Sequence, residues 1–275
     1  MAVSSDNLPT TIKFTDATAV LLLSMACSAN ETKFSPVDAS KWFHQTQLPN
    51  GHSWFNNEQQ HYTNRITNAY VSDGTLKVVA KKETFTDQGQ TKQYTTARLN
   101  SKLAFTYGRV EVRAKLPAGA GTWPAIWTLG KNIKEIGAYW QTQGYGTTSW
   151  PSCGEIDIME HLGHQAGTVH GTAHWGNSYS QWQHQGNDIS IYPDHFDGEF
   201  HVFSIDWTPN EINYLMDDEV YFTVNTAMMN GQNYPFNEAF FFILNVAVGG
   251  NWPGYPDETT SFPVFMAVDY IRVFQ

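Results

Sequence analysis

Apolar and polar residues alternate with a period of two along much of the chain. In the segment 109–116, apolar residues at even positions alternate with charged residues at odd ones, which predicts a strand with one buried face. The pattern recurs at 76–81, 201–207 and 266–274, whereas 240–248 is apolar on both faces, as in an inner strand. No stretch of useful length has a sustained period of 3.6. We therefore expect an all-β fold of two packed antiparallel sheets.

Two segments between the predicted strands stand out. Asp217 and Asp218 separate two β-rich runs and predict a hairpin, whose turn type stays open because no glycine is present. The segment 131–152 is a long insertion that contains four aromatic residues, Tyr139, Trp140, Tyr145 and Trp150. Loops of this length in compact domains usually serve a function. We expect this insertion to shape ligand choice and to be dispensable for folding.

Composition narrows the range of partners. The chain has 275 residues, of which 41% are hydrophobic and 15% aromatic, enough for one sizeable core in a single domain. The chain has 16 basic and 26 acidic residues, which gives a formal net charge of −10, and its sequence has no Lys/Arg cluster. This balance argues against nucleic acid and weakly against a heavily sulfated polysaccharide. A neutral polymer fits better.

Residues 1–36 form an N-terminal segment whose nature stays open. The stretch 18–27 resembles a short signal h-region that ends at a lipoprotein-type cysteine, but acidic residues precede it, and a buried strand explains it equally well. It is far too short to span a bilayer, so we expect no integral membrane span. The two cysteines, Cys27 and Cys153, form one bridge or none.

The candidate chemistry lies in the segment 154–161, which carries three acids. In a regular strand, Glu155 and Asp157 project from one face while the isoleucines that follow them enter the core. Glu160 is five residues after Glu155, so strict alternation would bury it. A one-residue bulge near 158–159 would return it to the face of the other two acids.

The bulge also sets the distance between the two glutamates. Four effective strand steps separate their Cα atoms by about 13 Å, and two side chains that lean together leave about 5 Å between the carboxyls. That separation is typical of a retaining glycosidase, because an inverting enzyme needs room for water. Three adjacent carboxylates cannot all ionise at neutral pH. We expect an ionised Glu155, a protonated Glu160, and a hydrogen bond from Asp157 to Glu155.

A solvated acidic strand edge is the alternative interpretation of these acids. Against it, the apolar residues at 156, 158 and 159 indicate an inner strand, where unpaired acids would be costly. The sequence from Glu155 to Glu160 also resembles the signature of glycoside hydrolase family 16 in its longer, bulged form. Within that family the chain is similar to bacterial laminarinases, which are endo-β-1,3-glucanases. The similarity begins near residue 37, continues to the C-terminus, and includes the motifs at 56–62, 97–102, 107–112, 121–127 and 245–254.

The resemblance implies a fold and a set of roles. The fold is a jelly-roll sandwich whose concave sheet forms a substrate cleft, built from a catalytic domain at 37–275. Glu155 matches the nucleophile, Asp157 the assisting acid and Glu160 the acid/base. The residues that match substrate-binding positions are Asn56, Arg98, Trp123, Trp127, His174 and Trp252.

Several of these positions have a purely structural alternative. Trp127 would then be a core residue, Arg98 would pair with a surface acid, and Glu58 would support the fold. The family requires no cofactor, but many members hold a structural calcium ion through an aspartate of the last strand, which corresponds to Asp269. No N-terminal partner ligand is identifiable in this chain, so calcium is left open.

The function expected from the resemblance is retaining endo-hydrolysis of internal β-1,3-glucosidic linkages in laminarin-type β-glucans. A mixed-linkage β-1,3-1,4-glucan or an agar-type galactan is the alternative substrate. A non-catalytic β-glucan-binding protein is the alternative of a different class, because a fold does not fix a function. We expect a polysaccharide partner, a monomeric state, and a secreted or cell-surface location.

Overall fold

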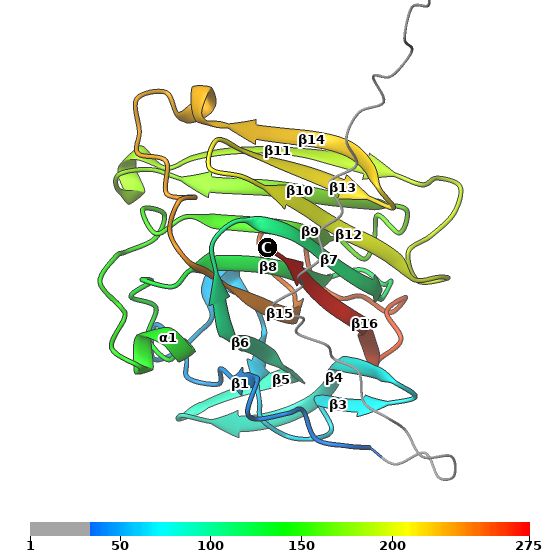
Figure 1. Ribbon diagram of the computed structural model, residues 1–275. Helices are drawn as coiled ribbons and strands as arrows, with labels where there is room; N and C mark the ends of the chain where they lie inside the picture. Colours follow the sequence, from blue (N-terminus) through cyan, green and yellow to red (C-terminus); the bar gives the residue numbers. More distant parts are fainter. Residues whose placement is uncertain (1–33) are drawn as a thin grey trace, which may run out of the picture.

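The computed structural model describes residues 34–275, and its two sheets lie face to face in a jelly-roll sandwich (Figure 1). The predicted lipoprotein-like stretch at 18–27, with Cys27, lies outside the described residues. Cys153 is buried and has no disulfide partner among residues 34–275. The all-β prediction is confirmed.

The first sheet has seven strands and carries the acid segment. All its neighbouring strands are antiparallel. In spatial order it consists of β1 (Trp42–His44), β6 (Arg98–Phe105), β15 (Phe240–Val248), β8 (Thr122–Gly130), β9 (Glu155–His161), β10 (Thr168–Trp175) and β11 (Gln183–Ser190).

The second sheet has nine strands. One pair, β2 with β5, is parallel, which the expectation of purely antiparallel sheets did not include. Its spatial order is β14 (Glu219–Asn225), β13 (Glu211–Met216), β12 (His201–Trp207), β7 (Gly108–Lys115), β16 (Val264–Phe274), β4 (Thr75–Asp87), β5 (Gln90–Thr96) and β2 (Gln60–Tyr62), with β3 (Ala69–Ser72) paired to β4. The helical elements of the described chain are short, namely η1 (Phe55–Asn57), α1 (Tyr139–Thr142), η2 (Tyr179–Gln181) and η3 (Thr226–Met229).

The main core fills the space between the two sheets, as the alternating pattern predicts. Along β7, Val110, Val112 and Ala114 are fully buried while the charged residues between them stay partly exposed. The predicted hairpin at Asp217 and Asp218 joins β13 to β14 as a two-residue loop. Both aspartates have positive φ, 48° and 69°, which is the type I′ geometry that glycine and asparagine also adopt in such turns.

Strand β15 is an inner strand, as predicted, and every one of its residues is buried. One face packs into the main core. The other face presents Phe241 and Ile243 to a second hydrophobic cluster, to which Ile133 and Ala138 of the 131–152 insertion contribute. The insertion thus covers the part of the outer face of the seven-stranded sheet around Phe241 and Ile243. The expectation that it is dispensable for folding does not fit this packing, because its removal would expose two large apolar side chains.

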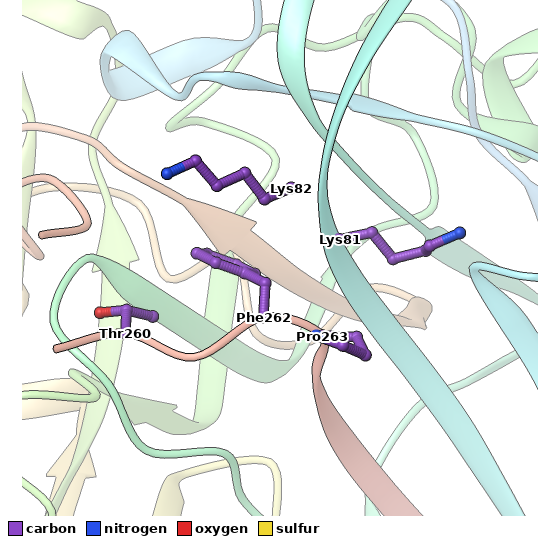
Figure 2. A pocket seen from close by; sticks show the side chains of 5 residues that line it. All are labelled: Lys81, Lys82, Thr260, Phe262 and Pro263. Atoms are coloured by element: carbon purple, nitrogen blue, oxygen red, sulfur yellow. The ribbon is translucent and has the colours of Figure 1, made fainter. Parts of the chain in front are cut away.

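No helix within residues 34–275 is long and apolar enough to cross a membrane. A pocket of about 330 Å³ lies beside β4 and the chain that leads into β16, lined by Lys81, Lys82, Thr260, Phe262 and Pro263 (Figure 2). The two lysine side chains extend in opposite directions, and the Lys81 ammonium lies near Glu83 at 3.7 Å. None of the three acids predicted to be catalytic lines this pocket, so the candidate site is built from the acids instead.

Candidate active site

A bulge in β9 brings the three acids to one face of the seven-stranded sheet. On the side of β8, Met159 pairs with Ile126 and Asp157 pairs with Trp127, the next residue. Ile158, between them on β9, therefore has no partner on β8. Facing β10, the register shifts at the same place. The extra residue returns Glu160 to the face of Glu155 and Asp157, while Ile156 packs into the main core. The bulge predicted at 158–159 is confirmed.

Gly154 positions the start of this strand. Its φ is +78°, in the left-handed region, and a Cβ there would lie 2.7 Å from the Phe240 ring. Glycine is thus needed both for the backbone turn and for the close approach to β15. The turn leads directly into Glu155, the first residue of β9.

Each of the two glutamates accepts a hydrogen bond from an indole. Trp123 on β8 donates its Nε1–H to Oε1 of Glu160 at 3.1 Å. Trp150, from the end of the insertion, donates to Oε2 of Glu155, also at 3.1 Å. These contacts fix the carboxyl groups in orientation. The role of Trp150 was not predicted, because its distance from the acids depends on how the insertion folds back.

His174 on β10 lies between the acids. Its Nε2 is 3.1 Å from Oδ2 of Asp157 and 3.8 Å from Oε1 of Glu155. The hydrogen bond expected from Asp157 to Glu155 is not among those of the described residues, and Asp157 faces His174 instead. His174 was predicted as a substrate-binding residue, and the structure brings it together with the acids.

Burial controls the protonation of the three acids. It raises the pKa of Glu155 to about 8, and the Asp157 carboxyl adds to the rise while His174 opposes it. Burial likewise raises the pKa of Glu160 to about 8, again with a contribution from Asp157. For Asp157 itself, burial holds the pKa well above its usual range. Burial thus favours the protonated form of these acids near neutral pH, which agrees with the expectation that the three do not all ionise together. The ionised Glu155 expected from the sequence does not follow from a pKa of about 8.

Trp127 and Trp123 lie on the same strand but have different surroundings. Trp127 is half-buried and donates its Nε1–H to Oδ1 of Asn245 at 2.8 Å. Asn245 in turn donates to the Tyr62 hydroxyl, which donates to Glu58. Burial raises the pKa of Glu58, and its carboxyl ends this network. The structural role considered for Glu58 therefore fits its contacts.

Arg98 is held by the insertion. Its guanidinium is 2.8 Å from the Glu135 carboxylate, and the two side chains are only 4% and 7% exposed. It also lies over the Trp127 ring, 4.8 Å from the centroid. Removing one partner of such a buried pair typically costs about 3–5 kcal/mol. The alternative considered for Arg98 was a pairing with a surface acid, whereas the acid that it meets, Glu135, is buried. The substrate contact expected of Arg98 stays a prediction.

Two predicted binding residues lie at the rim of the site. Trp252 is 43% exposed and meets Trp123 edge to face, at 5.6 Å between ring centroids. The backbone carbonyl of Asn56, in η1, accepts a hydrogen bond from the Asn251 backbone, so these two loops lie side by side. Asn56 and Trp252 are both exposed, and Trp252 contacts Trp123 directly.

Two places were considered for a metal ion. The carboxylate of Asp269 is 2.6 Å from the Arg113 guanidinium, and Asp269 belongs to no group of three potential ligand side chains among residues 34–275. Calcium at Asp269 stays a prediction. Glu155, Asp157 and His174 do form such a group, with one potential ligand atom from each within 4.8 Å of the others. Because hydrogen-bond partners already orient Glu155 and His174, we treat the group as an acid–base site.

Comparison with known proteins places this arrangement in a family. The family model for glycosyl hydrolases family 16 matches residues 56–272. A beta-glucanase from Rhodothermus marinus is 39% identical over 248 residues, covering 86% of this chain and 80% of that protein. A crystal structure of LamA from Z. galactanivorans in complex with laminaritriose and laminaritetraose is 45% identical, with a TM-score of 0.81, and covers 88% of this chain and 95% of that one.

The laminarinase catalytic domain from Thermotoga maritima MSB8 is 39% identical, with a TM-score of 0.77, and the match covers 92% of this chain and 98% of that domain. The family match, the two-sheet fold and the bulged acid strand agree with one another. This chain belongs to glycosyl hydrolases family 16.

Proposed function

We propose that this protein is a retaining endo-hydrolase of β-1,3-glucosidic linkages in laminarin-type β-glucans. The observation that carries the proposal is the bulge in β9, which gathers Glu155, Asp157 and Glu160 on one face. The relatives support the substrate, since they include laminarinases and a complex with laminari-oligosaccharides.

Glu160 is the proposed general acid/base and Glu155 the nucleophile. In the first step Glu160 gives its proton to the glycosidic oxygen, the bond from this oxygen to the anomeric carbon breaks, and the Glu155 carboxylate bonds to that carbon. In the second step Glu160 takes a proton from water, and the water oxygen displaces Glu155. The match of each residue to the family motif supports this assignment, because burial raises the pKa of both glutamates to about 8 and so does not distinguish them. The raised pKa lets Glu160 hold its proton at neutral pH, as the acid must.

Asp157 and the aromatic residues have supporting roles in this proposal. Asp157 lies between the two glutamates along β9, and its charge state influences the pKa of both. Trp123 and Trp252 offer indole faces that suit the apolar faces of glucose rings. Asn56 and Arg98 supply the polar contacts expected on the non-reducing side. Because the substrate is a polymer, we propose that the protein acts outside the cell or at its surface.

The alternatives differ in what they require of the site. A non-catalytic β-glucan-binding protein needs no acid pair, yet this site keeps three acids in a buried cluster that is costly to maintain. Mixed-linkage glucan and agar-type galactan need the same hydrolytic chemistry, but they differ from laminarin in their linkages, and the galactan differs also in its sugar units. The choice among polymers therefore rests on the walls of the site and must be measured.

A substrate panel tests the proposal. We expect purified protein to release reducing ends from laminarin and to yield oligosaccharides early, as internal cleavage requires. Lichenan, curdlan, agarose and κ-carrageenan are assayed beside it, with product sizing. A preference of tenfold or more in kcat/KM for agarose or carrageenan would overturn the assigned substrate, and binding without any release of reducing ends would favour the non-catalytic alternative.

A further inference from the structure

Trp182 is a residue near the acids to which neither the sequence pattern nor the proposed mechanism assigns a role. It follows η2 and is 40% exposed. Its indole stacks on His174, with 5.7 Å between ring centroids and 25° between planes, and on His184 of β11, at 5.2 Å. It also packs against Trp150, whose Nε1–H binds Glu155. Trp182 is thus connected to the acid cluster through two separate neighbours.

The contact with His174 is directional. The Nε1–H of Trp182 donates to Nδ1 of His174 at 3.1 Å. An indole nitrogen can only donate, so Nδ1 must offer its lone pair and cannot carry a proton. A neutral imidazole has one N–H, which therefore lies on Nε2. That nitrogen is the one that faces Asp157 and Glu155, at 3.1 Å and 3.8 Å.

We propose that Trp182 is a positioning residue that holds His174 as the neutral imidazole, with its proton on Nε2, the ring nitrogen nearest to Asp157. Doubly protonated His174 would turn a second N–H toward the indole N–H, and two donors would meet head to head. The inference rests on the proposed glycosidase function for its catalytic meaning, but the protonation state of His174 is a property of the structure alone.

The charged groups around His174 favour the opposite state. Glu155, Asp157 and Glu160 approach from β9, and His184 faces His174 from β11 at 5.6 Å between rings. Arg98 on β6 acts more weakly, through Glu155. An ionised Glu155, which the proposed mechanism requires, attracts a positive charge on His174, whereas the His184 imidazole opposes it. Without the indole donor, no contact at Nδ1 would exclude a second proton from His174.

A positive charge on His174 would change the chemistry of the site. A positively charged His174 would lower the pKa of both Glu155 and Glu160. With a lower pKa, Glu160 would lose the proton that the first step consumes at a lower pH, and it could no longer act as the acid above that pH. By holding His174 neutral, Trp182 keeps Glu160 protonated over a wider range of pH. Removal of the indole donor is therefore expected to reduce activity on the alkaline side of the pH profile.

The first test is made on the protein without substrate. Long-range ¹⁵N–¹H NMR of the imidazole rings reports which nitrogen carries a proton, and a His174→Gln variant identifies the His174 signals. We expect the wild-type protein to show neutral His174 protonated on Nε2 across the pH range in which it is active. A proton on Nδ1, or a His174 already doubly protonated across this range, would overturn the proposal whether or not the protein hydrolyses laminarin.

The second test uses Trp182→Phe, which keeps an aromatic ring and removes the N–H donor together with the five-membered ring of the indole. We expect His174 in this variant to become doubly protonated within the same pH range. The alkaline limb of kcat/KM should move to lower pH by about 1 unit, the lower end of the effect of an adjacent opposite charge. The control is Tyr179→Leu, since Tyr179 is 73% exposed, packs against Trp150 and donates no hydrogen bond to the acids or to His174. Its alkaline limb should stay where the wild-type limb lies.

The results separate the positioning role from mere packing. Loss of activity in Trp182→Phe with an unchanged pH profile and an unchanged His174 spectrum would contradict the proposal and leave the glycosidase function intact. A shift of the same size in Tyr179→Leu would also contradict it, because the effect would then come from the aromatic cluster as a whole. Absence of hydrolysis in the wild-type protein would overturn the proposed function, while the NMR result would still decide the state of His174.

Discussion

Replacing Glu155 with Gly is expected to reduce the hydrolysis of laminarin by at least about 10⁴-fold, because no carboxylate remains to bond to the anomeric carbon. The vacated space admits a small anion. With an aryl β-laminarioside that carries a good leaving group, added azide attacks the anomeric carbon while the aryloxide departs with its bonding electrons. This single inversion yields an α-glycosyl azide. Product NMR identifies the anomer.

The control for this experiment is Glu238→Gly. Glu238 is exposed and lies outside the acid cluster, so the variant should retain hydrolysis and form no azide adduct. A β-glycosyl azide from Glu155→Gly would mean that the roles of the two glutamates are exchanged. Undiminished hydrolysis in Glu155→Gly would remove Glu155 from the mechanism.

Replacing Glu160 with Ala should have an effect that depends on the leaving group. Laminarin has a poor leaving group that needs a proton, so we expect kcat/KM to fall by about 10²–10⁴-fold. An aryl glycoside with a good leaving group needs little proton transfer, and its first step should survive. The glycosyl–enzyme then accumulates because no base activates water. Stopped assays with the two substrates measure the contrast directly.

Azide again distinguishes the two glutamates. In Glu160→Ala, azide attacks the α-linked glycosyl–enzyme at the anomeric carbon, the bond to Glu155 breaks, and the product is a β-glycosyl azide. An equal loss of activity on both substrates would argue against a role for Glu160 in proton transfer. The two variants together assign the roles that the pKa values cannot, since burial raises both glutamates to a pKa of about 8.

Much of the fold follows from local pattern. Residues 109–116 alternate strictly, and the face that the pattern marks as apolar is the one buried in β7. The bulge in β9 could be predicted because Glu160 had to share a face with Glu155, which a regular strand does not allow. These features depend on residues that are close in the sequence, where the period of a strand determines which way a side chain points.

The remaining features depend on contacts between distant segments. The second buried face of β15 requires the insertion to fold back over the sheet, and the apolar run at 240–248 does not say what covers it. The hydrogen bond from Trp150 to Glu155 and the ion pair of Arg98 with Glu135 also form only because the insertion folds back over the sheet. Trp182 lies in a polar stretch with no motif around it, so its position beside His174 became visible only in three dimensions.

The central claim is that Glu155 attacks the sugar and that water attacks second. Early-time ¹H NMR of laminari-oligosaccharide cleavage by the wild-type protein tests it most directly, because the anomeric signals of newly formed reducing ends can be read before mutarotation mixes them. Two inversions at one carbon return the original configuration. The account predicts that the β-anomer appears first and the α-anomer grows in later. Initial appearance of the α-anomer would show a single inversion and would contradict the mechanism.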